Sequence, residues 1–584
     1  MKVISPQLTV DDAKSGFTWI DGIVVTVLFA LLWSALHFGK GMLVHFDPAA
    51  QVPIETSIRY IPYYAARTLL RMWVAFGFSL LFAISVGYMA AKDRRARVLI
   101  LPALDILQSV PVLGFLSATV TAFMALFPGS LMGVECAAIF AIFTGQVWNM
   151  AFGFYHSMVT VPTDMQEAAT TYGLTRWQRF RIVELPASAH SLIWNSMMSF
   201  GGGWFFVAQS EAISVMNKDI KLPGLGSYMA QSIERADHAA AFWAIVAMLV
   251  LILASDQLVW RPLLAWADKF KIELTVSAHP PTSWVYDLLR GAYVFTWMHE
   301  RIWEPVAERL TRLVRSRRRI LVPLRAAKRS RPSAWLRRGV LGALGVWLGA
   351  ELLPGIAAVI HALHGALTWP IFGHIVWLGV LTLLRVLAMT VIATLIWTPI
   401  GVWIGSQPRI ARFAQPMAQI GASFPVNMTF PLVVGLFVAG HVSMNWGSIL
   451  LIAMGTQWYI LFNVVAGAMA IPNDLKEAAR TYGLQRWDLW RTLILPAIFP
   501  FWVTGACTAA GGAWNASIVA ELATWGDTTL QADGLGAYIT TVTKSGDTPL
   551  IIASIGVMSL FVVVLNKFVW RRLYAFAERR FRLD

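Results

Sequence analysis

A polar segment that occurs twice constrains the fold of this chain more than any other feature. Residues 160–186 read TVPTDMQEAATTYGLTRWQRFRIVELP, and residues 470–496 read AIPNDLKEAARTYGLQRWDLWRTLILP. The two segments match at 14 of 27 positions without a gap, and Glu167 and Glu477 lie 310 residues apart. Self-similarity at a fixed offset is the signature of a duplicated structural unit. The chain is therefore predicted to consist of two similar halves.

The composition around these segments indicates a membrane protein. Of the 584 residues, 57% are hydrophobic and 14% are charged, whereas about 25% are charged in an ordinary soluble domain. The net charge of +15 does not indicate nucleic-acid binding, because the positive residues cluster between apolar stretches, as they do in cytoplasmic loops. We expect an all-α polytopic protein that contacts membrane lipids and no nucleic acid.

Each half has six apolar stretches of about the 20 residues that a membrane-spanning helix needs. In the first half they are 19–38, 68–91, 98–127, 132–159, 188–214 and 240–264, and in the second half 339–362, 376–405, 412–439, 446–469, 498–524 and 549–570. The predicted domains are a first half over residues 1–270, a basic linker over 271–338 and a second half over 339–584.

Further matches run in the same direction through both halves. The matched pairs are Thr68 and Thr382, Arg71 and Arg385, and Pro111 and Pro425 at an offset of 314 residues, then Trp204 and Trp514, and Glu211 and Glu521, at an offset of 310. Each half is therefore a complete unit of about six helices, and the two units are parallel repeats.

The charge of the linker predicts the orientation in the membrane. Residues 311–340 contain eleven arginines and lysines and no acidic residue, which is typical of a cytoplasmic segment. Six spans on each side of this linker then place both termini and both repeated segments in the cytoplasm. Residues 283–299 are apolar but contain Asp287 and Arg290, so we read them as a helix lying on the membrane surface. A crossing at this point would invert one half.

Each repeated segment has the pattern of a short amphipathic helix closed by glycine. Four residues at i, i+3, i+4 and i+7 share one helical face, and the glycine that follows readily adopts the left-handed conformation that ends a helix. A second short helix should end before a Leu-Pro pair, where proline begins the next span. The face residues are Met165, Ala168, Ala169 and Tyr172 in the first segment, and Leu475, Ala478, Ala479 and Tyr482 in the second.

This spacing resembles the signature of the inner-membrane permeases of ATP-binding-cassette importers, which reads EAA, three residues, G, nine residues and I-x-L-P. The matching residues are Glu167, Ala168, Ala169, Gly173, Leu185 and Pro186, and Glu477, Ala478, Ala479, Gly483, Leu495 and Pro496. Val183 and Leu493 replace the isoleucine. In that family the segment is a coupling helix that docks on an ATPase subunit.

The resemblance implies a type I importer permease in which both membrane cores are fused into one chain. It implies two ATPase subunits on the cytoplasmic side, an external or periplasmic solute-binding protein, and a place in the bacterial cytoplasmic (inner) membrane. The glycine and tryptophan pattern near Glu211 and Glu521 is similar to the branch that imports nitrate, taurine, alkanesulfonates and related small anions.

The chain has no motif for catalysis of its own. It contains no GxxxxGK[ST] sequence to cradle ATP phosphates, so it should bind no cofactor, and ATP and Mg²⁺ belong to the partner ATPase subunits. Cys136 and Cys507 have no metal-ligand spacing. His361 and His364 lack a carboxylate partner at ligand spacing, which argues against a membrane enzyme. No catalytic or metal site is predicted.

The fifth predicted span of each half carries candidate residues of the substrate pathway. A carboxylate in a membrane segment indicates function by default, although Glu211 and Glu521 could also be held by loop backbone near the outer interface. The arginines at 67, 71 and 385 could serve an anion or act as interfacial anchors. The candidates are Trp204, Gln209, Glu211, Trp514, Asn515 and Glu521.

Two other transport functions remain open. Parallel halves also occur in twelve-helix secondary transporters, but such a transporter has no use for the two repeated cytoplasmic segments. The coupling pattern by itself does not fix the direction of transport, so export is an alternative to import.

Overall fold

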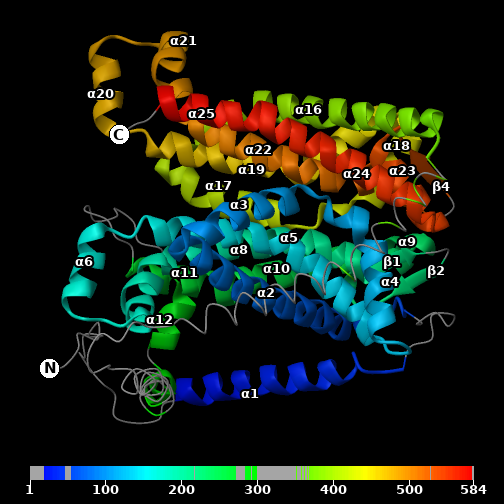
Figure 1. Cartoon of the computed structure of the whole chain (residues 1–584), viewed down its shortest axis with the longest axis horizontal. Helices are drawn as coiled ribbons and strands as arrows, with labels where there is room; N and C mark the ends of the chain where they lie inside the picture. Colours follow the sequence, from blue (N-terminus) through cyan, green and yellow to red (C-terminus); the bar gives the residue numbers. More distant parts are fainter. Residues whose placement is uncertain are drawn as a thin grey trace. The chain divides into compact units, whose positions relative to one another are not determined.

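Helices form most of the described part of this chain in the computed structural model (Figure 1). The structure describes residues 19–45, 54–215, 218–270, 283–290, 292–298, 367–525 and 528–581, together with single positions between 301 and 365. The predicted span at 339–362 and most of the basic linker, including its basic residues 311–338, fall outside the continuous part of this description. The chain forms two compact units, which are not the two halves of the repeat.

The first unit contains residues 1–39, 157–193 and 255–353. Its helices are α1 (Trp19–Lys40), α6 (Thr163–Thr171), α7 (Arg176–Arg179), α11 (Arg261–Asp268), α12 (Trp284–Arg290) and α13 (Tyr293–Met298). In this unit the backbone N–H of Val294 donates to the buried carboxylate of Asp21 at 2.7 Å. With 7 and 6 residues, α12 and α13 are each too short to cross a membrane.

The second unit contains residues 40–156, 194–254 and 354–584, and therefore the membrane cores of both halves. Its first-half helices are α2 (Ile61–Lys92), α3 (Arg94–Ser109), α4 (Leu116–Leu126), α5 (Met132–Val159), α8 (Leu185–Glu211), α9 (Leu225–Glu234) and α10 (His238–Ser255). Its second-half helices are α16 (Trp369–Gly405), α17 (Pro408–Ser423), α18 (Phe430–Ala439), α19 (Met444–Ala470), α20 (Asn473–Thr481), α21 (Arg486–Leu489), α22 (Leu495–Ala520), α23 (Leu535–Ser545), α24 (Thr548–Leu565) and α25 (Arg571–Arg580).

Seven helical segments in the described part of the chain are long and apolar enough to cross a membrane. They are Ile58–Lys92, Met132–Val159, His238–Asp268, Trp369–Gly405, Met444–Ala470, Arg486–Ala520 and Thr548–Arg580. They confirm a polytopic helical protein, and each of the three segments of the first half has an equivalent among the four of the second half.

The predicted spans at 98–127 and 412–439 are wrong as single helices. Each consists of two helices with a break between them, α3 and α4 in the first half and α17 and α18 in the second. The break lies at Val110 and Phe424, which both adopt an extended conformation immediately before Pro111 and Pro425. Proline disfavours the helical conformation of the residue before it, and at these two positions the first helix ends before the duplicated proline in both copies.

The second short helix of each repeated segment does not end before the Leu-Pro pair, contrary to the prediction. It continues through one π-helical turn, Phe180–Glu184 or Trp490–Ile494, into the next long helix. In this turn the N–H of Leu495 donates to the carbonyl of Trp490, five residues earlier. Proline lacks the N–H of a regular helix and clashes with the carbonyl four residues before it. The wider turn relieves this conflict.

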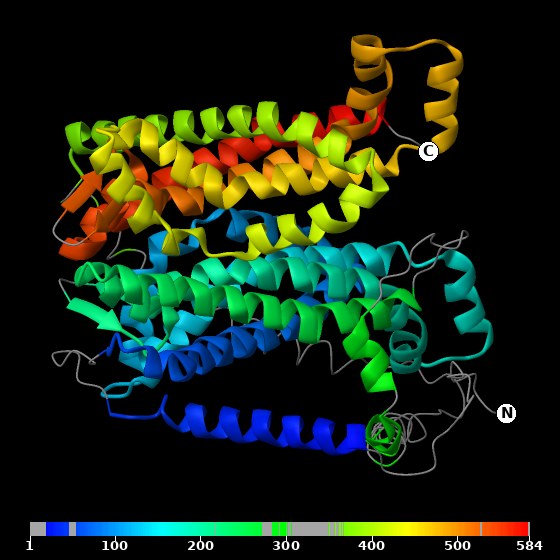
Figure 2. The same ribbon diagram turned by 180° about the vertical axis from the view of Figure 1, so that it is seen from behind.

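A two-stranded antiparallel hairpin follows the long helices α8 and α22. The hairpins are β1 (Ala212–Val215) with β2 (Lys218–Lys221), and β3 (Leu522–Trp525) with β4 (Thr528–Gln531). Helix α23 of the second half packs on β1, and α9 of the first half packs on β3. Within this unit, α20 and α21 project from one end of the bundle, and the hairpin β3–β4 lies at the other (Figures 1 and 2).

Candidate functional site

The first repeated segment forms the glycine-capped helix that the sequence predicts. Gly173 has a φ of 64°. Its N–H donates to the carbonyl of Thr170 at 2.9 Å, and the N–H of Leu174 donates to that of Ala169 at 3.1 Å. These two bonds are the Schellman closure of a helix. Thr175 and Gln178 then form a capping box that starts α7.

The second repeated segment closes in the same way. Gly483 has a φ of 69°, and its N–H donates to the carbonyl of Arg480 at 3.0 Å. The N–H of Leu484 donates to the carbonyl of Ala479, also at 3.0 Å. The two copies therefore have the same local geometry, although they match at only about half of their residues.

Both segments expose apolar side chains. Tyr172 is 75% exposed and Tyr482 is 83% exposed, and Trp177 and Trp487 are also exposed. The remaining members of this surface in both copies are Met165, Glu167 and Ala168, and Leu475, Glu477 and Ala478, whereas Ala169 and Ala479 are buried. A repeated, exposed apolar patch beside a charged residue is typical of a protein-binding surface.

Four charged side chains form a buried cluster in the first half. Glu135 on α5 accepts hydrogen bonds from Arg67 at 2.6 Å and from two nitrogens of Arg71 on α2. Arg71 also donates to Glu211, at the end of α8, at 2.7 Å. All four side chains are at most 1% exposed. Two arginines therefore balance two carboxylates within the protein interior.

Glu211 also holds the loop that follows its hairpin. Its carboxylate accepts hydrogen bonds from the hydroxyl of Thr68 and the N–H of Gly226, both at 2.7 Å. The Thr68 oxygen accepts in turn from the N–H of Leu225 at 2.9 Å. Beyond this loop, buried Tyr228 donates to the carbonyl of Thr56 at 2.7 Å. Burial raises the pKa of the Tyr228 hydroxyl, which keeps it a donor.

The second half contains a smaller version of this cluster. Glu521 accepts hydrogen bonds from Thr382 at 2.8 Å, from Arg385 at 3.0 Å and from the N–H of Gly536 at 2.8 Å. Asn445 occupies the position of Glu135 and accepts from Arg385 at 2.8 Å. The amide of Asn445 also donates to Asp533 at 3.1 Å. One arginine here balances one buried carboxylate.

These contacts identify the partners of the arginines at 67, 71 and 385. Each arginine pairs with a buried carboxylate, so none acts as an interfacial anchor. The sequence analysis did not single out Glu135. Its pairing could not be read from the repeat, because Glu135 aligns with Asn445 and Arg67 aligns with Leu381. The conserved offsets of Thr68, Arg71 and Glu211 were the available signal for the rest of the cluster.

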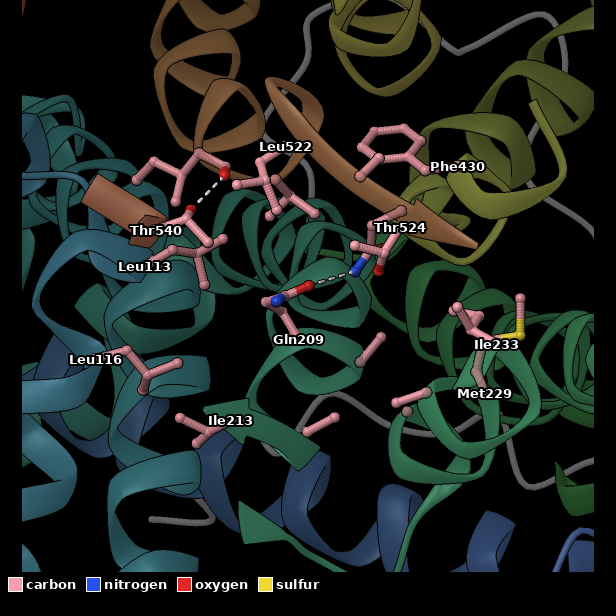
Figure 3. Close-up of a pocket in the computed structure, with 18 of the residues that line it drawn as sticks. Leu113, Leu116, Gln209, Ile213, Met229, Ile233, Phe430, Leu522, Thr524 and Thr540 are labelled. Carbon is pink, nitrogen blue, oxygen red and sulfur yellow. Dashed lines mark hydrogen bonds between the residues drawn. The ribbon is translucent and has the colours of Figure 1, made fainter. Parts of the chain in front are cut away.

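A cavity of about 280 Å³ lies between the two halves, within the second unit. Figure 3 shows its walls. They come from the loops after α3 and α17, which are equivalent in the two halves, from the ends of α8 and α22, and from α9 and α23. Gln209 extends into this space and accepts a hydrogen bond from Asn427 at 3.2 Å. The lining also includes Thr524, Thr540, Thr543 and Lys544.

Of the six residues predicted for the substrate pathway, Gln209 lines this cavity. Asn515 accepts a hydrogen bond from the N–H of Val112 of the other half at 2.9 Å. Trp204 and Trp514 are each 1% exposed and pack against phenylalanines, and Glu211 and Glu521 belong to the two buried clusters. In the described part of the chain, no three His, Cys, Asp or Glu side chains gather as a metal site.

Comparison with known proteins gives several relatives among transport permeases. The nitrate import permease protein NrtB of Leptolyngbya laminosa is 27% identical over 193 residues, which cover 33% of this chain and 66% of NrtB. The bicarbonate transport system permease protein CmpB of Synechococcus elongatus is 25% identical over 245 residues, or 40% of this chain and 84% of CmpB. The taurine transport system permease protein TauC of Escherichia coli is 24% identical over 185 residues, or 32% and 64%.

The family described as binding-protein-dependent transport system inner membrane component matches this chain twice, over residues 83–259 and 397–583. Each match contains one repeated segment, the π-helical turn at the end of that segment and the long helix after it. The two matches together cover more than half of the chain. The protein therefore belongs to this family of inner-membrane permeases and carries two copies of its domain in one polypeptide.

Proposed function

We propose that this chain is the complete membrane pathway of an ATP-driven importer, with both permease cores in one polypeptide. The observation that carries the proposal is the pair of repeated segments, which have the same closure and expose the same kinds of side chain. An ATPase subunit docks on each: one on α6 near Glu167, the other on α20 near Glu477. Family membership favours this function over a twelve-helix secondary transporter.

The partners follow from this arrangement. The ATPase subunits bind ATP and Mg²⁺, and this chain binds neither. A solute-binding protein delivers the solute to the opposite side of the membrane. Both termini and both coupling segments then lie in the cytoplasm, and the hairpins with the two charged clusters lie at the outer end.

The solute is a small anion, which accords with relatives named for nitrate, bicarbonate and taurine. It passes through the cavity beside Gln209. Trp204, Glu211, Trp514, Asn515 and Glu521 remain predictions for the pathway. Their contacts in the structure are those of residues that support the walls of the cavity.

The test is co-purification of the tagged chain with its ATPase from membranes that produce both. Glu167→Arg combined with Glu477→Arg should release the ATPase, because two positive charges then replace the exposed carboxylates of both docking surfaces. Glu55→Arg, a charge reversal at an exposed position outside both segments, is the control and should retain the ATPase. If the folded wild-type chain retains no ATPase, the proposal is wrong.

A further inference from the structure

The cavity between the two halves is polar mainly on the side of the second half. Three apolar residues of the first half line it, namely Leu113, Ala230 and Ile233. Their equivalents in the second half also line it, and these are Asn427, Thr540 and Thr543. At one further position the polar residue belongs to the first half: Gln209 lines the cavity, and its equivalent in the second half is Val519. The duplicated scaffold thus supplies matching walls, and substitution in one copy has given them different chemistry.

The same asymmetry places one positive charge at the cavity. Lys544 is the charged residue among the described residues that line it. The equivalent residue of the first half is Glu234, which is outside the lining and pairs with Lys221 at 2.6 Å. Gln531 replaces Lys221 in the second half. In the described part of the chain, Lys544 therefore has no ion-pair partner, and its charge is available to a solute.

Two polar atoms on the same side lack a hydrogen-bond partner. The side-chain oxygens of Asn427 and Thr543 are buried, and neither forms a hydrogen bond within the described structure. Buried polar atoms are nearly always satisfied by protein, water or ligand. Both residues line the cavity, so a solute that enters it can complete their bonding.

The chemistry of these groups specifies what that solute must carry. The ammonium group of Lys544 donates only, and it favours an anion. The amides of Asn427 and Gln209 are joined by one hydrogen bond. Whichever way the two amides are turned, the pair keeps at least one donor and one acceptor for a third partner. An anion made only of acceptors leaves that acceptor unpaired, at a cost in affinity.

We infer that this cavity binds a small monoanion that also carries a hydrogen-bond donor. Its volume is close to the lower end of the range of about 300–1,000 Å³ for ligand sites, which favours a small solute. Bicarbonate and hydroxylated sulfonates meet the requirement, and nitrate does not. The inference rests on the proposed function, because it assigns the cavity to the solute pathway.

The experiment measures binding in the cavity without the solute-binding protein. Ile233 lines the cavity and is partly exposed. In the chain with Cys136 and Cys507 changed to serine, Ile233→Cys provides a thiol whose rate of reaction with uncharged methyl methanethiosulfonate is followed. The complex with the ATPase is used, with and without ATP. The probes are two matched pairs of monoanions: isethionate with ethanesulfonate, and bicarbonate with nitrate.

Isethionate and bicarbonate, which have a hydroxyl donor, should slow the reaction at concentrations about tenfold lower than ethanesulfonate and nitrate. Lys544→Gln should weaken protection by all four anions by about tenfold, the scale of one lost charge-assisted hydrogen bond, and Lys544→Arg should retain it. Asn427→Leu combined with Gln209→Val, which installs the residue of the other half at both positions and removes both amides, should remove the difference within each pair. Glu234→Gln is the matched control and should change nothing.

Equal protection by both members of each pair would overturn the donor requirement, and unchanged protection in Lys544→Gln would overturn the anion site. A thiol at position 233 that does not react in either nucleotide state would show that solutes do not enter the cavity, which overturns the inference as well. In the first two cases a chain that still retains its ATPase keeps the proposed function. In the third case such a chain keeps the docking of the ATPase but loses this cavity as the solute pathway. Loss of the ATPase from the folded wild-type chain contradicts that function separately.

Discussion

Glu135 and Asn445 occupy equivalent positions in the two halves, and each binds the arginine of the preceding long helix. Glu135 forms ion pairs with Arg67 and Arg71, whereas Asn445 accepts hydrogen bonds from the side chain of Arg385 at its amide oxygen and at its backbone carbonyl. Leu381 stands where the first half has Arg67. The second half thus lacks one carboxylate and one arginine together, and both clusters remain neutral.

The clusters predict unequal effects of removing the matched glutamates. In Glu521→Gln, Arg385 loses its carboxylate partner in a buried site, and breaking such a pair costs about 3–5 kcal/mol. In Glu211→Gln, Arg71 still pairs with Glu135, so the loss should be smaller, about 1–3 kcal/mol. Thermal unfolding of the purified variants in detergent measures this order. Equal midpoints would show that Glu135 does not compensate for Glu211.

The missing charges of the second half can be restored as a pair. Asn445→Glu alone adds a carboxylate near Glu521 and Asp533 without a second arginine, so the midpoint of thermal unfolding should fall. Leu381→Arg alone buries an unpaired arginine and should also lower it. The double variant rebuilds the composition of the first-half cluster and should recover at least about 1 kcal/mol over the sum of the single changes. Additive losses would refute this coupling.

Replacement of the glycines that close α6 and α20 should strain the backbone. A Cβ at Gly173 or Gly483 would meet no atom within 4 Å, but both residues have a positive φ. Alanine at each position should destabilise the local turn by about 1 kcal/mol, and asparagine should be tolerated better. In the alanine variants we expect faster proteolysis after residue 173 or 483. The midpoint of global thermal unfolding should not change.

Lack of room for a side chain, and not backbone conformation, explains why a glycine precedes α23. Gly534 has an extended backbone with a φ of −159°, and a Cβ there would overlap the carboxylate of Glu521. Gly534→Ala should therefore displace Glu521 from Thr382 and lower both the thermal midpoint and transport. Gly556→Ala is a matched control, because a Cβ at that position meets no atom within 4 Å. Similar losses in both variants would rule out this steric explanation.

The sequence predicts the duplicated elements well, because a pattern that occurs in both copies rarely arises by chance. The helix and glycine closure of the coupling segments and the parallel repeat are examples. The two broken spans were missed because hydropathy continues through Pro111 and Pro425, and only backbone geometry ends the helix there. The π-helical turns were missed because Leu-Pro usually begins a helix.

The contacts that differ between the halves could not be predicted from the repeat. Glu135 has no carboxylate at its equivalent position in the second half. Its partners come from a helix about 65 residues earlier in the chain. The cavity combines residues more than 200 positions apart, such as Gln209 and Asn427. Pairing of this kind depends on how the helices of the two halves pack, and hydropathy and spacing contain no information about it.

Joining both cores in one polypeptide also changes what mutation can achieve. In a permease made of two identical subunits, every substitution beside the central cavity appears twice, so a lysine brings a second lysine and their mutual repulsion. Here Lys544 and Glu234 have evolved as separate sites, as have Asn445 and Glu135. One polypeptide thus carries an asymmetric pathway whose two halves are always present in a one-to-one ratio. Two different subunits do not have to assemble.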